Sequence, residues 1–244
     1  MKKIVITFLV CTFIISTFIY IGVDAYANED NADISKYINF LYSEEMAERR
    51  EAVTQLRSIG SQAVPAIEDV IEDKDSDSST RHSAVRALEG IGGEEVLQVL
   101  IKALEDPEAR VRRRALTAIE DLNIDRTSVI PYLINILNDE DDSEVKSAAI
   151  SVLTQLDSEA IEAIPALMKA LDEGGFEVAW PASNLLESLA SEHKQQFANE
   201  LALILIEKGP GAKQEVLDVI TRVGIDIDPV ILSLKGFWKM KNSG

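Results

Sequence analysis

A hydrophobic pattern that returns about every 33 residues constrains the fold of this chain more than any other feature. The pattern is clearest in RHSAVRALEGIG (81–92) and RRRALTAIEDLN (112–123), each of which has an alanine at its fourth position. Aliphatic residues follow four and seven positions later, a spacing that lines one face of a helix. Equivalent anchor residues recur at intervals of 31 to 34 residues: Ala52, Ala84, Ala115, Ala149, Ala182 and Val216.

Most repeats continue into a second apolar segment, as in VPAIEDVIED (64–73) and AIPALMKALDE (163–173). Proline near the start of such a segment suits the first turn of a helix, where its missing N–H costs least. Two short amphipathic helices cannot bury their apolar faces alone, so successive pairs must stack. The sequence therefore predicts an all-α fold, an α-solenoid or superhelix of about six helix–turn–helix repeats. These repeats are expected near residues 43–74, 75–106, 107–139, 140–173, 174–208 and 209–240.

The first 27 residues stand apart from the repeats and are predicted to be a signal peptide or a signal anchor. Two lysines precede an almost continuous apolar run at residues 4–23, and Ala25-Tyr26-Ala27 is a small-x-small cleavage pattern. Cleavage near Ala27 predicts an exported chain, periplasmic or secreted. Without cleavage, the run is long enough to hold the chain at a membrane, with the remainder outside the cytoplasm. Residues 28–42 are expected to form an N-terminal capping helix before a repeat domain at 43–244.

The charge balance argues against one class of partner. The chain has 42 acidic and 24 basic residues and a formal net charge of −18. Such a charge repels a phosphate backbone, so we expect no binding of nucleic acid. The only cysteine is Cys11, inside the apolar run, so the repeats contain neither a disulfide nor a reactive thiol.

The recurring x-V-R-x-x-A-x-x-A-L-x-x-I-G pattern, seen at Thr80–Gly92 and Val111–Asn123, resembles the HEAT-repeat family. The short period and the single basic residue are similar to its phycobilisome-lyase-type HEAT-like branch. The resemblance implies a scaffold that binds another protein. The pattern itself specifies a shape and not a reaction.

Five of the six repeats carry a basic residue three positions before the anchor, and the fifth repeat has Ala179 there. The resemblance implies that these residues pair between repeats, with Asp106 or Glu108 within reach of Arg112. Neighbouring Arg110, Arg113 and Arg114 follow no repeat logic and either are solvated or contact an acidic partner. The predicted inter-repeat structural residues are Arg49, Arg81, Arg112, Lys146 and Lys213.

A search for catalytic or metal-binding combinations of residues gives no candidate. His82 and His193 belong to non-adjacent repeats and should not share a site, so each is predicted to be structural or solvated. The acidic runs at 72–79 and 138–144 are interpreted as helix-capping turns, because the first departs from a calcium-loop pattern. We therefore predict no cofactor, no metal and no enzymatic activity.

Polar positions on the second helices of the repeats are the candidate binding surface, since these helices normally line the concave side of HEAT-like stacks. The leading interpretation is a non-catalytic scaffold or adaptor of the cell envelope or extracellular space. A lyase-type or metal-dependent enzyme on the same scaffold, or a membrane-tethered structural spacer, are the alternatives. Trp180 is expected to serve in packing. The candidate partner-binding residues are Glu68, Glu72, Gln98, Lys102, Tyr132, Asn135, Lys169 and Asp172.

Overall fold

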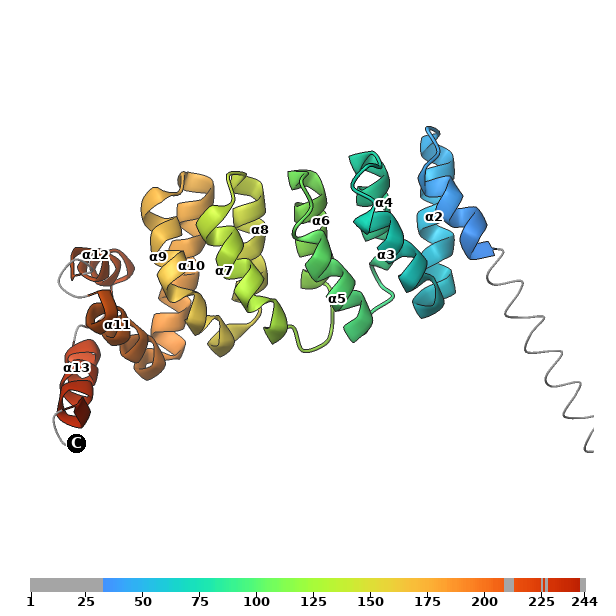
Figure 1. Cartoon of the computed structure of the whole chain (residues 1–244). Helices are drawn as coiled ribbons and strands as arrows, with labels where there is room; N and C mark the ends of the chain where they lie inside the picture. The colour runs from blue at the N-terminus through green and yellow to red at the C-terminus, as the bar shows by residue number, and fades with distance from the viewer. Residues whose placement is uncertain (1–32, 209–212, 225, 227, 242–244) are drawn as a thin grey trace, which may run out of the picture. The chain divides into compact units, whose positions relative to one another are not determined.

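The computed structural model describes residues 33–208, 213–224, 226 and 228–241 (Figure 1). The regular secondary structure of these residues is helical, which confirms the predicted all-α repeat fold. The chain divides into two compact units, one ending at Ile91 and the other beginning at Gly92. This division falls between the two helices of the predicted second repeat.

The first unit contains the helices that precede Gly92. A helix at residues 33–41 comes first. It is followed by α2 (Met46–Ile59), a 3-10 turn η1 (Gly60–Ala63), α3 (Val64–Glu72) and α4 (Ser78–Leu88). Helix α4 packs against both α2 and α3, so the first helix of one repeat covers the hairpin before it.

The second unit continues the same alternation of first and second helices. Its elements are α5 (Glu94–Ala103), α6 (Ala109–Glu120), η2 (Thr127–Val129), α7 (Ile130–Asp139), α8 (Ser143–Thr154), η3 (Asp157–Ala163), α9 (Ile164–Glu173), α10 (Phe176–Glu192), α11 (Lys194–Lys208), α12 (Lys213–Val223) and α13 (Asp228–Lys241). First helices pack on first helices, α6 on α8 and α8 on α10, while α7 packs on α9 (Figure 1). First and second helices of this unit therefore form two layers, as expected for stacked helical hairpins.

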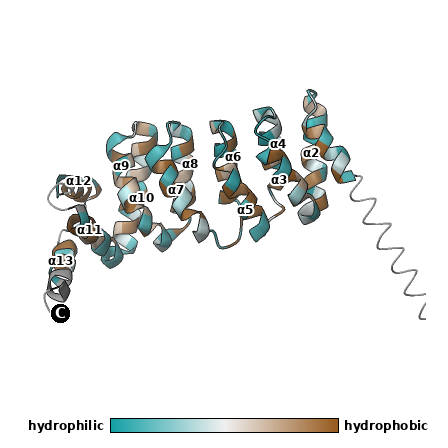
Figure 2. Ribbon diagram, in the orientation of Figure 1, coloured by the Kyte–Doolittle hydropathy of each residue, from teal (hydrophilic) through white to brown (hydrophobic). Residues whose placement is uncertain are grey.

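The anchor residues lie at the centre of the helix contacts. All five anchor alanines are completely buried, and Val216 is 1% exposed. The residues four positions later are also buried, from Leu56 to Ile220. Hydrophobic and hydrophilic residues occupy different faces of the helices, as an amphipathic pattern requires (Figure 2). A methyl group at the anchor lets neighbouring helices approach closely, which explains why alanine recurs there.

The helix ends follow from local chemistry. Pro65, Pro131 and Pro165 occupy the first turns of α3, α7 and α9. Gly60 ends α2 with a φ of 80°, a conformation that a side chain would strain. The acidic turns cap helices as predicted. The Asp77 carboxylate accepts from the Ser79 N–H, and the Asp142 carboxylate accepts from the N–H groups of Glu144 and Val145.

The predicted signal or anchor segment at residues 1–27, with its apolar run at 4–23, lies outside the described residues. The same holds for residues 28–32 of the predicted capping helix. In the part of the chain that the structure does describe, no helix has the length and hydrophobicity needed to span a bilayer.

Candidate protein-binding cleft

Three of the predicted structural arginines hold the turn that precedes their own helix. Arg49 donates to the Ser43 carbonyl, and Arg81, which is 2% exposed, donates to the Ser76 carbonyl. Arg112 donates to the Asp106 carbonyl at 2.7 Å. The recurring basic residue therefore satisfies backbone acceptors of the inter-repeat turn.

Arg112 also joins two repeats. Its Nε and a second guanidinium nitrogen reach the two carboxylate oxygens of Glu140 at 2.6 and 2.7 Å. Glu140 follows α7, so the acidic partner comes from the next turn instead of from the side chains of Asp106 or Glu108. Burial alone would raise the pKa of Glu140. Hydrogen bonds from Arg112 and from the N–H groups of Asp142 and Asp141, with the charge of Arg112, lower it below its ordinary value.

The two predicted lysines occupy the equivalent positions of α8 and α12. Lys146 on α8 is half-buried, and Lys213 at the start of α12 is exposed. Of the remaining arginines in the opening run of α6, Arg113 pairs with Glu144 of α8. Arg110 and Arg114 also have interaction partners.

Two further arginines link neighbouring repeats, and sequence reasoning missed both. Arg57 of α2 donates to the Arg86 carbonyl at 2.7 Å and pairs with Glu89 at 3.2 Å. Arg126 donates to backbone carbonyls at the end of α6 and to the Gln155 side chain at 2.9 Å. Neither residue recurs at a fixed place in the repeat, so no periodic signal marks them.

The eight candidate partner-binding residues lie on four second helices. The first unit contributes Glu68, which is half-buried, and Glu72 on α3. The remaining pairs belong to the second unit: Gln98 and Lys102 on α5, Tyr132 and Asn135 on α7, Lys169 and Asp172 on α9. Of these, Lys169 and Asp172 line a common cleft and the other six lie outside its lining.

The cleft has a volume of about 650 Å³ and is bounded by α7, α9, α12 and the end of η3. Its floor is apolar and its rim is charged. The apolar lining consists of Ile134, Pro165, Ala166, Met168, Leu171 and Val219. The charged lining consists of Glu162, Lys169, Asp172, Glu173, Asp218 and Arg222. A few polar groups around an apolar floor are the usual composition of a binding pocket.

The rim carries an excess of negative charge. Lys169 lies 3.9 Å from Glu173, and Arg222 lies 3.7 Å from Asp172, so the two basic residues each have an acidic neighbour. Within the described residues, no Lys, Arg or His lies within ion-pair distance of Glu162 or Asp218, and Asp218 accepts only from Gln214, at 2.8 Å.

Further carboxylates lie near Glu162 of the cleft lining. Burial raises the pKa of the Glu200 carboxyl, and the nearby charges of Glu207 and Glu162 raise it further. These carboxylates add to the negative charge on the Glu162 side of the cleft, which favours a cation.

Trp180, which is expected to serve in packing, lies instead largely at the surface. Trp180 is 60% exposed on α10, and Phe176, one turn earlier, is 82% exposed. Trp180 precedes the buried anchor Ala182 by two positions, which places it on the opposite side of the helix. Beside it runs a second, more open hollow of about 520 Å³, lined largely by uncharged polar residues of α8 and α10.

The sequence comparison decides the family. A family model described as HEAT repeats matches residues 34–120 and 98–187, more than half of the chain. The chain belongs to the HEAT-repeat family. The resemblance inferred from the repeated alanine and arginine pattern is thereby confirmed, and HEAT repeats account for the two helical layers. The search of curated proteins found no match to this chain.

Solved structures with similar folds include natural and engineered repeat proteins. The complex of CpcE and CpcF of phycocyanin lyase from Nostoc sp. PCC7120 has 21% identity and a TM-score of 0.49, covering 86% of this chain and 89% of that one. A designed armadillo repeat protein has 18% identity and a TM-score of 0.47, with coverages of 80% and 98%. An engineered protein has 22% identity and a TM-score of 0.46, with coverages of 82% and 97%. At these values the neighbours indicate nothing about the partner or activity of the HEAT chain.

Proposed function

We propose that this HEAT-repeat chain is a non-catalytic scaffold that binds another protein through the cleft between α7, α9 and α12. The observation that carries the proposal is the cleft itself, an apolar floor enclosed by a charged rim. Two residues singled out as candidate contacts, Lys169 and Asp172, lie on that rim. Two of the three helices, α7 and α9, are second helices, and stacked repeats form extended surfaces suited to protein segments.

The charges of the rim favour one kind of segment. Glu162 and Asp218 present carboxylates without a basic neighbour among the described residues, while the apolar floor favours aliphatic or aromatic side chains. A complementary segment would combine apolar residues with lysine or arginine. Charge complementarity of this kind contributes mainly to specificity and to the association rate.

The proposal for the cellular location depends on the N-terminal segment instead of on the cleft. We propose that the chain acts outside the cytoplasm, in the cell envelope or the extracellular space, because residues 1–27 have the layout of a signal segment. Mass measurement of the mature protein tests this location. A first residue of Asn28 supports release, whereas retention of residues 4–23 with the membrane fraction supports the tethered-spacer alternative.

Selection of peptides from a random display library on the purified chain tests the cleft. We expect enriched peptides that combine apolar residues with lysine or arginine. Ile134→Glu places a charge in the lining and should abolish their binding. Ile231→Glu is the matched control, because Ile231 is a partly exposed isoleucine on α13 that does not line the cleft.

Charge reversal tests the chemistry of the rim. Glu162→Lys and Asp218→Lys should each weaken binding of the selected basic peptides by roughly tenfold and reduce its salt dependence. Glu187→Lys makes the same change of charge at an exposed position of α10 and should leave binding unaltered. Peptides that bind the Ile134→Glu chain as well as the original would show that the cleft is not the binding surface. Turnover of a small substrate by the purified chain would instead support the enzymatic alternative.

A further inference from the structure

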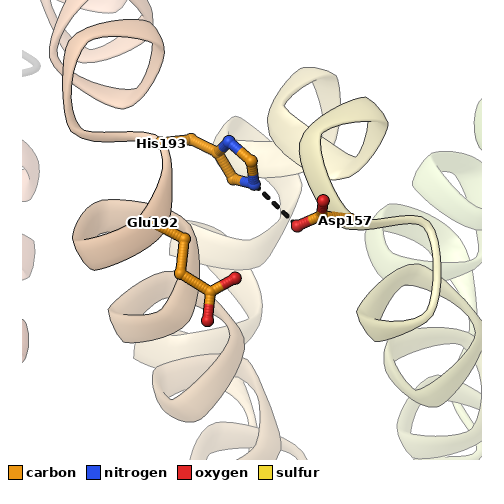
Figure 3. Close-up of side chains that lie close together, drawn as sticks. All are labelled: Asp157, Glu192 and His193. Atoms are coloured by element: carbon orange, nitrogen blue, oxygen red, sulfur yellow. Dashed lines mark hydrogen bonds and ion pairs between the residues drawn. The ribbon is translucent and has the colours of Figure 1, made fainter.

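Three potential metal-ligating side chains from two predicted repeats meet at the junction of α10 and α11 (Figure 3). Asp157 is the first residue of η3, Glu192 is the last residue of α10, and His193 follows it directly. The His193 Nε2 and Asp157 Oδ1 atoms are 2.6 Å apart. One ligand atom from each of the three residues lies within 4.8 Å of the other two.

The backbone holds these residues in place. The His193 N–H donates to the Leu189 carbonyl at 2.9 Å, and the His193 carbonyl accepts from the Phe197 N–H at 2.9 Å. The imidazole is 19% exposed and is therefore largely enclosed between the repeats. Asp157 is the one non-glycine residue with positive φ among the described residues, at 50°, which turns the chain between α8 and η3.

The arrangement leaves negative charge unbalanced. Asp157 and Glu192 are both exposed carboxylates, and within the described residues neither pairs with a lysine or arginine. Adjacent Lys194 instead lies 3.8 Å from Asp226. The hydrogen bond between His193 and Asp157 accounts for two of the three side chains but leaves Glu192 without a role. A divalent cation would use all three and neutralise both carboxylates.

We propose that Asp157, Glu192 and His193 form a binding site for a divalent transition-metal ion of the Zn²⁺ type. Imidazole nitrogen with carboxylate oxygen is a donor set that suits zinc, whereas calcium and magnesium prefer oxygen ligands alone. Bond lengths of about 2.0–2.2 Å in a tetrahedral site place ligand atoms roughly 3.4 Å apart. The Asp157 carboxylate would move slightly away from His193 Nε2 and Glu192 would move inward, which the exposure of both carboxylates permits. Water would complete the coordination.

The proposed ion would cross-link the turn after α8 to the end of α10. These elements belong to neighbouring repeats, 36 residues apart in the sequence. Ligands this far apart in sequence lie close together only in the folded chain, so metal binding should stabilise folding. The site is separate from the α7–α9–α12 cleft, none of whose lining residues it uses.

Isothermal titration of the full chain, prepared without a polyhistidine tag, with ZnCl₂ tests the site. We expect saturable binding of one Zn²⁺ that depends on these residues and is not displaced by millimolar Ca²⁺ or Mg²⁺. His193→Ala, Asp157→Asn and Glu192→Gln should each weaken the affinity by roughly tenfold or more. His82→Ala and Glu187→Gln remove the same kinds of side chain elsewhere and should bind as the original chain does.

Thermal unfolding gives an independent readout. Zn²⁺ at a hundredfold excess over its Kd should raise the midpoint of the original chain by roughly 5 °C or more. The shift should be lost in Glu192→Gln, which changes an exposed side chain and retains the fold even where His193→Ala does not. Absence of saturable binding, or an affinity unchanged in Glu192→Gln and Asp157→Asn, would overturn the proposal. Equal affinity for Ca²⁺ would overturn the assignment to the zinc class.

Discussion

Arg112 shows how one repeated side chain can serve both its own turn and the next repeat. It donates hydrogen bonds to the Asp106 carbonyl and to both carboxylate oxygens of Glu140. Lysine would keep the charge but cannot supply this fork of donors. Arg112→Lys should therefore lower the free energy of unfolding by about 1–3 kcal/mol. Urea unfolding followed by circular dichroism measures the loss, and Arg110→Lys, at an exposed position of α6, is the control.

The ion pair between Glu140 and Arg112 should make the stability of the folded chain depend on pH in the acidic range. Because its pKa is lower in the folded chain than the ordinary value of 4.5, its contribution to stability is complete above about pH 4.5. The contribution is lost as the pH falls through the folded-state pKa. The difference in Tm between the original chain and Glu140→Gln should therefore be largest at neutral pH and shrink toward pH 3. A difference that stayed constant over this range would contradict the assignment.

The backward reach of Arg112 could be predicted from its place beside the apolar stripe, but its carboxylate partner could not. Asp106, Glu108 and Glu140 all lie in turns, and the choice among them depends on how two neighbouring repeats are packed. The contact between Asp157 and His193 escaped prediction for the same reason. The partner of His193 lies in the preceding repeat, 36 residues away, and no spacing within one repeat points to it.

Helix positions were the most predictable feature, because the anchor and its following aliphatic residues mark one face of each first helix. Helix α11 is the instructive exception. Adjacent residues are buried on it in pairs, Phe197 with Ala198 and Leu201 with Ala202, since it packs against α10 and α13. These four residues cover a broad arc of one face, and the exposed Ile206 lies away from that arc, so the amphipathic pattern is obscured in the sequence.

Part of the cleft lining could also be predicted from the sequence. The polar stripe of α9 indicates Lys169 and Asp172, whereas the contribution of α12 depends on tertiary packing.

The anchor alanines set how closely the first helices approach one another. Ala115 is fully buried where α6 packs on α8. Ala115→Leu should overpack this contact and lower the free energy of unfolding by about 1–3 kcal/mol. Ala148→Leu introduces the same side chain at a half-buried position next to an anchor and should cost clearly less. Urea unfolding of both variants provides the comparison, and equal costs would contradict the role of the anchor.

At the scale of the whole chain, HEAT repeats make the stability nearly a sum of local terms. Within each compact unit neighbouring hairpins pack on one another, and the division between the units falls after Ile91. The effect of Ala115→Leu should therefore remain local. Hydrogen exchange read by mass spectrometry should accelerate in α6 and α8 while α2 retains its protection. Uniform acceleration over all helices would instead indicate a single cooperative unit.

The outward position of Trp180 has a practical consequence. An indole that stands in water emits at longer wavelengths than one shielded by a binding partner. The sequence has one other tryptophan, Trp238, so a Trp238→Phe chain would carry a single fluorophore on α10. Its emission maximum would report, without any attached dye, whether a molecule settles over the first-helix layer.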